Sequence, residues 1–317
     1  MRMSYSSSQL LQGCARKYYY KKIVKRNIDP DVSEDTTALR VGSCYHDILE
    51  NALHGEMDVT REAFDESFKK HELYGDLTLC GMIEAMVIKY IEMHKKTKLS
   101  IVACEEQIGD DDIIGYVDAI MKDANGGWYI CDLKTAAWLS GSLLSRLSLD
   151  PQLNLYSYYA NIIASTYNLD VKKFKGVLYR VTTKCKIKKL NKESNETYIG
   201  RCLDRIEAYS IFIPTKDLIP EKVHADMMRL LGRAQALKEV DEAEVPQNFG
   251  YCEQYFKPCE YWSNCYGNTF SGASQGRQLM DSTNAVAMVS SVEEVEEAEF
   301  DDLFDDDDDL LDFMDED

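Results

Sequence analysis

The segment IIGYVDAIMKDANGGWYICDLKT, residues 113–135, most constrains the fold because it places acidic side chains inside two apolar strands. The residues on either side of its Asn-Gly-Gly sequence have the β-branched and aromatic composition of strands, and Asn-Gly-Gly itself is typical of a turn. Burying carboxylates in such a strand pair is costly unless they bind a cation. The segment therefore predicts a β-hairpin in which Asp118 and Asp132 have a function.

The relative position of the two aspartates depends on the length of the hairpin loop. With a three-residue loop, a common length when glycine is present, Ala124 pairs with Trp128. Asp118 then lies opposite Lys134, with Asp132 as its diagonal neighbour at roughly 7–8 Å. All three side chains project from one face because side chains alternate along a strand. A two-residue loop would instead place the acids on opposite faces, so we expect the three-residue loop.

Two carboxylates and a lysine in this arrangement fit phosphodiester hydrolysis. Hard oxygen ligands suit Mg²⁺ or Mn²⁺. Such a cation polarises a phosphoryl group and lowers the pKa of a bound water, and Lys134 can orient that water or stabilise developing charge. Taken alone, Asp-x-Lys is also compatible with a surface hairpin that carries exposed charges. Glu105 and Glu106, on the preceding predicted strand, are equally compatible with metal support and with surface charge.

Four short motifs follow one another in an order that carries a resemblance. They are GSCYHDILE at residues 42–50, GYVDAI around Asp118, YICDLKTA around Asp132, and Gln152-Leu153-Asn154-Leu155-Tyr156. Together they resemble the RecB/AddB-type nucleases of the PD-(D/E)XK superfamily, which include the CRISPR-associated adaptation nucleases. The resemblance covers residues 4–267. Gln152 and Tyr156 are four residues apart, so one face of a helix presents both.

The resemblance implies an α/β fold with a mixed central β-sheet flanked by helices, the restriction-endonuclease-like core. It implies a metal-dependent DNA nuclease, acting as an exonuclease on single strands or DNA ends in recombination, repair or replication, and it suits a stand-alone or phage-encoded enzyme. The implied metal ligands are His46, Asp118, Asp132 and the Leu133 carbonyl, and the implied catalytic residues are Asp118, Asp132, Lys134, Gln152 and Tyr156. A non-catalytic DNA-end-binding or partner-recruiting module with the same fold, and an RNA-directed nuclease, are the alternatives.

Sequence composition places the elements of this fold. Residues 101–108, 113–121, 128–133, 174–182 and 208–213 have the composition of strands. Helices are expected from the Ser-rich start to about residue 26 and over residues 42–53, 61–73, 82–96, 151–165 and 221–240.

Four cysteines lie at the two ends of the predicted nuclease domain. Cys252, Cys259 and Cys265 fall in YCEQYFKPCEYWSNC, and Cys14 falls in LLQGCARKYYY. A subset of RecB-type nucleases holds a 4Fe-4S cluster with one cysteine before and three after the nuclease motifs, and the resemblance implies the same here. The chain departs from that subset at Ala15, where proline is usual, and in its longer gap between Cys252 and Cys259. Spacing alone does not separate a cluster from four-cysteine zinc or from buried thiols, and the other six cysteines are interpreted as core residues.

The net charge of −19 is concentrated at one end of the chain. Residues 292–317 contain 16 Asp and Glu and no Lys or Arg, so the rest of the chain carries only −3. A near-neutral body with local basic clusters can bind phosphate backbones, although each cluster can equally be a solvated face. The clusters are Arg16, Lys17, Lys21, Lys22, Lys25 and Arg26, and Lys184, Lys186, Lys188 and Lys189.

The expected organisation is a nuclease domain over residues 1–270, a flexible linker over 271–291 and an acidic disordered tail over 292–317. The apolar residues of the tail can dock on a protein partner, the tail can occupy the protein's own DNA channel, or it can simply solubilise the chain. No stretch approaches the roughly 20 apolar residues that cross a bilayer, and the N-terminus lacks a signal-peptide h-region. We therefore expect no membrane partner and a cytoplasmic location, bacterial or in a phage-infected cell.

Overall fold

The structure is a computed structural model and describes residues 2–28, 37–55, 59–254 and 257–266. Residues 1–261 form one compact unit, and a second unit begins at Trp262. Within the second unit the described residues contain the short helix α11 (Trp262–Tyr266). The predicted linker and acidic tail, residues 271–317, lie outside the described residues.

A six-stranded mixed sheet forms the centre of the first unit, as the sequence predicted. Its order is β1-β3-β4-β5-β6, and β2 also pairs with β3. The β1–β3 and β4–β5 pairs are parallel, and the other pairs are antiparallel. All five predicted strands are present, whereas β1 has only two residues, too few for a sequence pattern. The strands are β1 (Met3–Ser4), β2 (Ser100–Gly109), β3 (Ile113–Lys122), β4 (Trp128–Ala136), β5 (Phe174–Thr183) and β6 (Ala208–Pro214).

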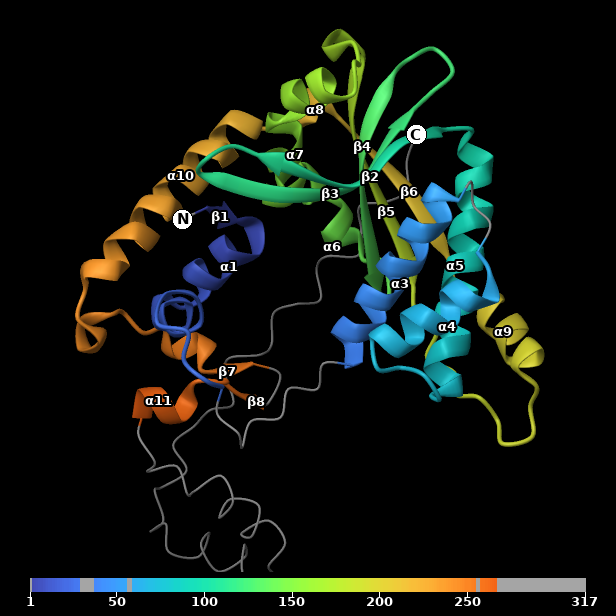
Figure 1. Ribbon diagram of the computed structural model, residues 1–317, viewed down its shortest axis with the longest axis horizontal. Helices are drawn as coiled ribbons and strands as arrows, with labels where there is room; N and C mark the ends of the chain where they lie inside the picture. Colours follow the sequence, from blue (N-terminus) through green and yellow to red (C-terminus); the bar gives the residue numbers. More distant parts are fainter. Residues whose placement is uncertain (1, 29–36, 56–58, 255–256, 267–317) are drawn as a thin grey trace, which may run out of the picture. The chain divides into compact units, whose positions relative to one another are not determined.

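Helices cover both faces of this sheet (Figure 1). On one face α3 (Thr37–His54) contacts β2 and β4, and α5 (Leu77–Thr97) contacts β5 and β6. On the other face α7 (Pro151–Tyr158) contacts β4 and β5 and packs against α10 (Pro220–Ala236). The remaining helices are α1 (Tyr5–Gly13), α2 (Ala15–Tyr18), α4 (Arg61–Lys70), α6 (Gly141–Leu144), α8 (Ala160–Thr166) and α9 (Asn195–Leu203). Among the described residues, no helix is both long and apolar enough to span a bilayer.

The helices of the structure differ from the predicted ones at several places. The helix predicted over residues 151–165 is divided into α7 and α8 at Tyr159. The helix expected from the Ser-rich start to residue 26 is interrupted at Cys14, whose backbone is extended, and it continues as α2 and a π-helical turn (Tyr19–Ile23). α9 was not expected, because only Tyr198 and Cys202 of its nine residues are buried. Its place in the fold depends on packing against α5, which local sequence does not encode.

The periodicity of α3 determines which of its side chains are available to a site. Its buried residues recur at helical spacing along one face, through Val41, Tyr45, Ile48 and Ala52, and the first three belong to a hydrophobic core cluster. His46 lies on the flank of that face and is only partly buried. Core packing of α3 therefore fixes the direction in which His46 points.

Trp128 anchors the start of β4, the strand that carries Asp132. Its side chain is fully buried, its indole N–H donates to the Asp170 carbonyl at 2.9 Å, and its ring lies 4.4 Å from that of Phe174. These contacts hold the parallel β4–β5 pair together where it begins.

We predict that Trp128→Ala lowers the free energy of unfolding by about 3–5 kcal/mol, because it leaves a large cavity and removes the hydrogen bond from the indole to the Asp170 carbonyl. Trp138→Ala is the matched control: that side chain is 67% exposed, so its loss should change stability by less than about 0.5 kcal/mol. Urea unfolding followed by circular dichroism measures both. Equal losses in the two variants would contradict the anchoring role.

Candidate metal-binding active site

The β3–β4 hairpin has a different register from the predicted one. Lys122 pairs with Trp128 and Ala119 with Cys131, so the loop has five residues and the predicted pairing of Ala124 with Trp128 is wrong. The reason is Asp123, whose Oδ1 accepts hydrogen bonds from the backbone N–H groups of Asn125 and Gly127 and closes a wider turn. Because the shift is two residues, each side chain keeps its predicted face of the hairpin.

Asp118 lies where β3 and β4 separate. The pairing ends at Ala119 and Cys131, and beyond that point β2 and β3 bend away from β4 (Figure 1). One residue further, Asp118 Oδ2 accepts a hydrogen bond from the backbone N–H of Leu133. The carboxylate thus takes the place of a main-chain acceptor and holds the edge of the split. Continuing the observed register would set Asp118 opposite Asp132, whereas the predicted register set it opposite Lys134.

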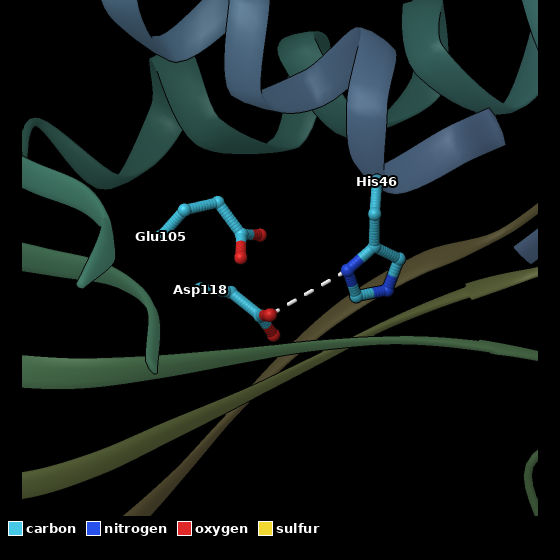
Figure 2. Close-up of side chains that lie close together, drawn as sticks. All are labelled: His46, Glu105 and Asp118. Atoms are coloured by element: carbon cyan, nitrogen blue, oxygen red, sulfur yellow. Dashed lines mark ion pairs between the residues drawn. The ribbon is translucent and has the colours of Figure 1, made fainter. Parts of the chain in front are cut away.

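Three side chains from three elements converge on this split (Figure 2). They are His46 from α3, Glu105 from β2 and Asp118 from β3, and one ligand atom of each lies within 4.8 Å of the others. His46 Nδ1 is 3.5 Å from Asp118 Oδ1. The three border an open groove of about 630 Å³, which is also lined by Gly42, Glu50, Lys70, Thr135 and Lys184.

Glu105 is brought to the site by an unusual backbone conformation. Its φ is 49°, in the left-handed region, and the regular β2–β3 ladder steps from Cys104 to Glu106. Such a conformation in a residue with a side chain costs on the order of 1 kcal/mol or more and is concentrated at functional sites. Partial burial raises the pKa of Glu105 to about 7, and Asp118 and Glu50 add to this effect. Sequence did not decide between metal support and surface charge for Glu105, and the structure places it in the cluster.

Asp132 and Lys134 form the inner part of the site. Asp132 is fully buried, and its Oδ1 accepts a hydrogen bond from Lys134 Nζ at 2.8 Å. Within the described residues, its Oδ2 is buried and has no hydrogen-bond partner. Burial raises the pKa of Asp132 to about 7, although Lys134 opposes the shift. A buried carboxylate oxygen without a partner is costly, and a cation ligated there would remove that cost.

The donor atoms available here fit a small divalent cation. Carboxylate oxygens of Asp118 and Asp132, with Glu105 beside them, are hard ligands of the kind that Mg²⁺ and Mn²⁺ prefer, and imidazole is compatible with Mn²⁺. Burial lowers the pKa of His46, but the neighbouring Asp118 more than compensates, so the pKa is raised. A ligating histidine must be neutral, and a cation at this site therefore competes with a proton on His46.

Helix α7 adds Gln152 and Tyr156 to the inner side of the site. Asp150 caps the helix by accepting from the backbone N–H of Gln152 at 2.8 Å, and Gln152 Nε2 donates to the Tyr156 hydroxyl. Tyr156 is buried, and burial together with Asp132 and Asp118 raises its pKa. The structure therefore brings the predicted helical pair close to the aspartates.

Tyr5 is a further neighbour that sequence reasoning missed. Burial raises its pKa to about 12; Asp150 and Asp132 add to this rise, and Lys134 opposes it. It opens α1 directly after the N-cap Ser4, whose hydroxyl accepts from the backbone N–H of Ser7 at 3.2 Å. The capping serine was visible in the sequence, but only the tertiary fold brings the first turn of this helix to the aspartates.

The predicted cysteine ligands Cys14, Cys252 and Cys259 lie in two chain segments that pack together. Arg16 donates from its backbone N–H to the Pro246 carbonyl at 3.0 Å, and Asn248 Nδ2 donates to the Gly13 carbonyl at 2.8 Å.

The main chains of two of these cysteines are hydrogen-bonded, because the Cys259 backbone N–H donates to the Cys252 carbonyl at 2.7 Å. Burial raises the pKa of the Cys259 thiol, and Lys17 and Cys14 are close enough to influence it. Cys265 belongs to α11 in the second unit.

We predict that Asp132→Asn removes both the pH dependence and the metal dependence of stability that arise at this carboxyl. The folded pKa lies above the ordinary value of 3.8, so the folded state retains a proton that the unfolded state loses. The free energy of unfolding of the metal-free protein therefore falls as pH rises from about 4 to about 7.

Mg²⁺ or Mn²⁺ should raise the melting temperature of the unaltered protein most above pH 7, where the carboxylate is ionised. Asp132→Asn should be more stable than the unaltered metal-free protein at pH 8 and should gain little from either ion. Thermal unfolding with and without EDTA at pH 5, 6, 7 and 8 measures this, with Asp111→Asn on the exposed β2–β3 turn as the control. A full metal-induced shift in Asp132→Asn would exclude Asp132 as a ligand.

Three comparisons with known proteins bear on the identity of this site, and one of them, with protein-family models, identifies the family. No curated protein sequence matches the chain. The solved structure titled "Crystal structure of SSO0001" is 14% identical over 72% of this chain and 86% of that chain, with a TM-score of 0.25, a likeness too weak for any argument. The family model of the PD-(D/E)XK nuclease superfamily matches residues 2–266, which include every described element from β1 to α11. The chain therefore belongs to the PD-(D/E)XK nuclease superfamily.

Proposed function

We propose that this protein is a metal-dependent deoxyribonuclease that hydrolyses phosphodiester bonds as an exonuclease on single strands or DNA ends. The observation that carries the proposal is the Oδ2 of buried Asp132, which has no hydrogen-bond partner in the part of the chain that the structure describes, while Lys134 Nζ donates to the other oxygen of the same carboxylate at 2.8 Å. A carboxylate in this state is adapted to a cation, and the adjacent ammonium group is placed to act beside it. Recombination, repair or replication is the proposed setting.

The proposed ligands of Mg²⁺ or Mn²⁺ are Asp118, Asp132, His46 and the Leu133 carbonyl. Such an ion, when bound, polarises the phosphoryl group and lowers the pKa of a water molecule. Asp118 is held in place by the Leu133 N–H, so its remaining oxygen is directed to the side of His46. Glu105 reaches the same space from β2 and provides a further carboxylate ligand.

Lys134 is the proposed water-positioning and charge-stabilising residue. Burial lowers the pKa of its ammonium group, but the negative charges of Asp132 and Asp118 more than compensate. The pKa is therefore raised, and the group stays protonated. A fixed positive charge in a partly buried site stabilises negative charge that develops on a phosphoryl oxygen. Gln152 and Tyr156 form a hydrogen-bonded pair beside the aspartates and are proposed to support the site or contact DNA.

We further propose that Cys14, Cys252, Cys259 and Cys265 hold a 4Fe-4S cluster, with Zn²⁺ as the alternative. The support is the packing of the segment around Cys14 against residues 243–261, together with the hydrogen bond between Cys259 and Cys252. Four thiolates complete such a cluster. Bonding residues more than 200 positions apart would restrict the unfolded chain, so the role would be structural.

We also propose that the acidic segment 292–317 recruits a protein partner through its apolar residues, on the basis of its composition. The four motifs in order support assignment to the RecB/AddB subtype. The proposed location is the cytoplasm of a bacterial or phage-infected cell.

We predict that the full-length protein degrades labelled single-stranded DNA when Mg²⁺ or Mn²⁺ is present and not when EDTA replaces the ion. Asp132→Ala and Lys134→Ala should each lower kcat by about 100-fold or more, because each removes a charge that acts in the transition state. Asp111→Ala and Lys172→Ala, both at exposed positions, are the matched controls. Product ladders from 5′- and 3′-labelled strands give the polarity, and an RNA strand tests the substrate class.

Identical behaviour of the unaltered protein and the Asp132 and Lys134 variants would refute the enzyme and favour a non-catalytic DNA-end-binding module. Degradation of RNA alone would refute the deoxyribonuclease.

We predict that protein purified without oxygen is brown and absorbs near about 400 nm, where iron–sulfur charge transfer occurs. Cys14→Ser and Cys259→Ser should each lose this absorbance and lower the melting temperature, whereas Cys44→Ser, on the buried face of α3, should keep the colour. Iron and zinc analysis of the same samples decides between the two metals. A colourless protein that contains one zinc ion per chain would show that the site binds zinc and not an iron–sulfur cluster.

A further inference from the structure

Residues 184–188, which follow β5 directly, carry three lysines at alternate positions and are fixed to the body of the protein. We call this segment the lysine ribbon. Cys185 is buried in the hydrophobic core and Ile187 packs against it, so the alternate residues Lys186 and Lys188 are exposed. Lys184 is half-buried at the start of the ribbon, and its Nζ donates to the Ala38 carbonyl at 3.5 Å. Alternate side chains of an extended chain lie roughly 6.6 Å apart, comparable to the spacing of phosphates along an extended nucleic-acid strand. In the part of the chain that the structure describes, no acidic side chain forms an ion pair with any of the three lysines.

Helix α9 holds the main chain of this ribbon in place. The Tyr198 hydroxyl donates to the Ile187 carbonyl at 3.0 Å, and Arg201 donates to the Lys188 carbonyl at 2.9 Å. On the opposite side the Lys184 N–H donates to the Ala136 carbonyl at 2.8 Å, which joins the ribbon to the end of β4. The lysines are therefore presented from a fixed backbone.

An exposed tryptophan lies beside the lysines. Trp138 is 67% exposed, and Lys186 Nζ lies 5.4 Å from the centre of its ring. It follows β4 by two residues, and the four residues from Lys134 to Trp138 span at most about 14 Å. A large aromatic surface left in water so near the site gains nothing for the core.

The ribbon and Trp138 leave the sheet at the edge where the groove lies. β4 and β5 are parallel and end side by side at the Ala136–Thr183 pair. Thr135 and Lys184, next to those ends, line the same groove as His46 and Asp118. A strand lying in the groove would therefore continue onto the ribbon.

We propose that Trp138 and the lysine ribbon bind single-stranded nucleic acid next to the cleavage site, with one nucleobase stacked on Trp138 and phosphates bound by Lys184, Lys186 and Lys188. The proposal rests on the nuclease function and adds a specificity for single strands. An exposed ring binds the face of a base that is free to unstack, whereas the bases of a duplex are stacked on each other. The lysines form no ion pair within the described residues, and this favours a polyanion over an apolar protein segment.

The test is binding of fluorescent strands to the full-length protein in EDTA, measured by anisotropy. Trp138→Ala should raise the Kd for oligothymidine by about tenfold and leave the Kd for an abasic strand of equal length unchanged, because that strand has phosphates but no bases. A duplex should also bind as before. Trp138→Phe should restore most of the affinity for oligothymidine.

Lys186→Ala with Lys188→Ala should weaken the thymidine and abasic strands alike and reduce the salt dependence of log K by roughly 1.4, the value for two phosphate contacts on a single strand. Tyr74→Ala is the matched control, because Tyr74 is 60% exposed and has Lys69 Nζ 5.0 Å from its ring centre but does not line the groove. This variant should bind every strand normally.

The outcomes separate this inference from the function on which it rests. If the unaltered protein does not cut DNA with Mg²⁺ or Mn²⁺, the proposed function fails whatever Trp138 does. If it cuts DNA and Trp138→Ala binds oligothymidine normally, the stacking role is wrong. An equal loss for thymidine and abasic strands would also overturn it, because base stacking would not be the cause.

Discussion

The hydrogen bond from the Leu133 N–H to the Asp118 carboxylate is the contact on which the rest of the site depends. At this point β3 stops pairing with β4, and a main-chain donor inside a sheet would otherwise be left without an acceptor. Asp118 satisfies that donor with one oxygen and directs the other to His46. The separation of the strands creates the room for the site, and the same aspartate that stabilises the separation would supply a ligand to the proposed metal ion.

This geometry brings negatively charged carboxylates close to one another, so they repel each other. Asp118 lies close both to buried Asp132 and to the more exposed Glu105, and burial raises the pKa of both Asp132 and Glu105 to about 7. Lys134 and His46 offset only part of the negative charge. A divalent cation bound at the proposed site would therefore compete with a proton near neutral pH.

The N-terminal helices and the segment before α11 are tied together away from the sheet. Glu260, almost fully buried, forms ion pairs with Lys17 at 2.9 Å and Lys21 at 3.0 Å. Two lysines that the sequence assigned to a basic, DNA-binding cluster thus hold an internal carboxylate. The fixed lysines after β5 have no such partner among the described residues, so of the two basic clusters theirs is better suited to phosphate.

The sequence by itself predicted a mixed sheet flanked by helices and named candidate residues for the site. Strand composition identifies five of the six strands, and the spacing of Gln152 and Tyr156 on one helical face needs no tertiary information. Only the tertiary structure decided the hairpin register, because Asp123 closes a wider turn than Asn-Gly-Gly predicts. It also decided that Glu105 joins the cluster and that Tyr5 lies near it, since a left-handed backbone and a helix docked from the chain start leave no periodic signal. Local patterns record which face of an element is buried, whereas the convergence of side chains from separate elements depends on how those elements pack.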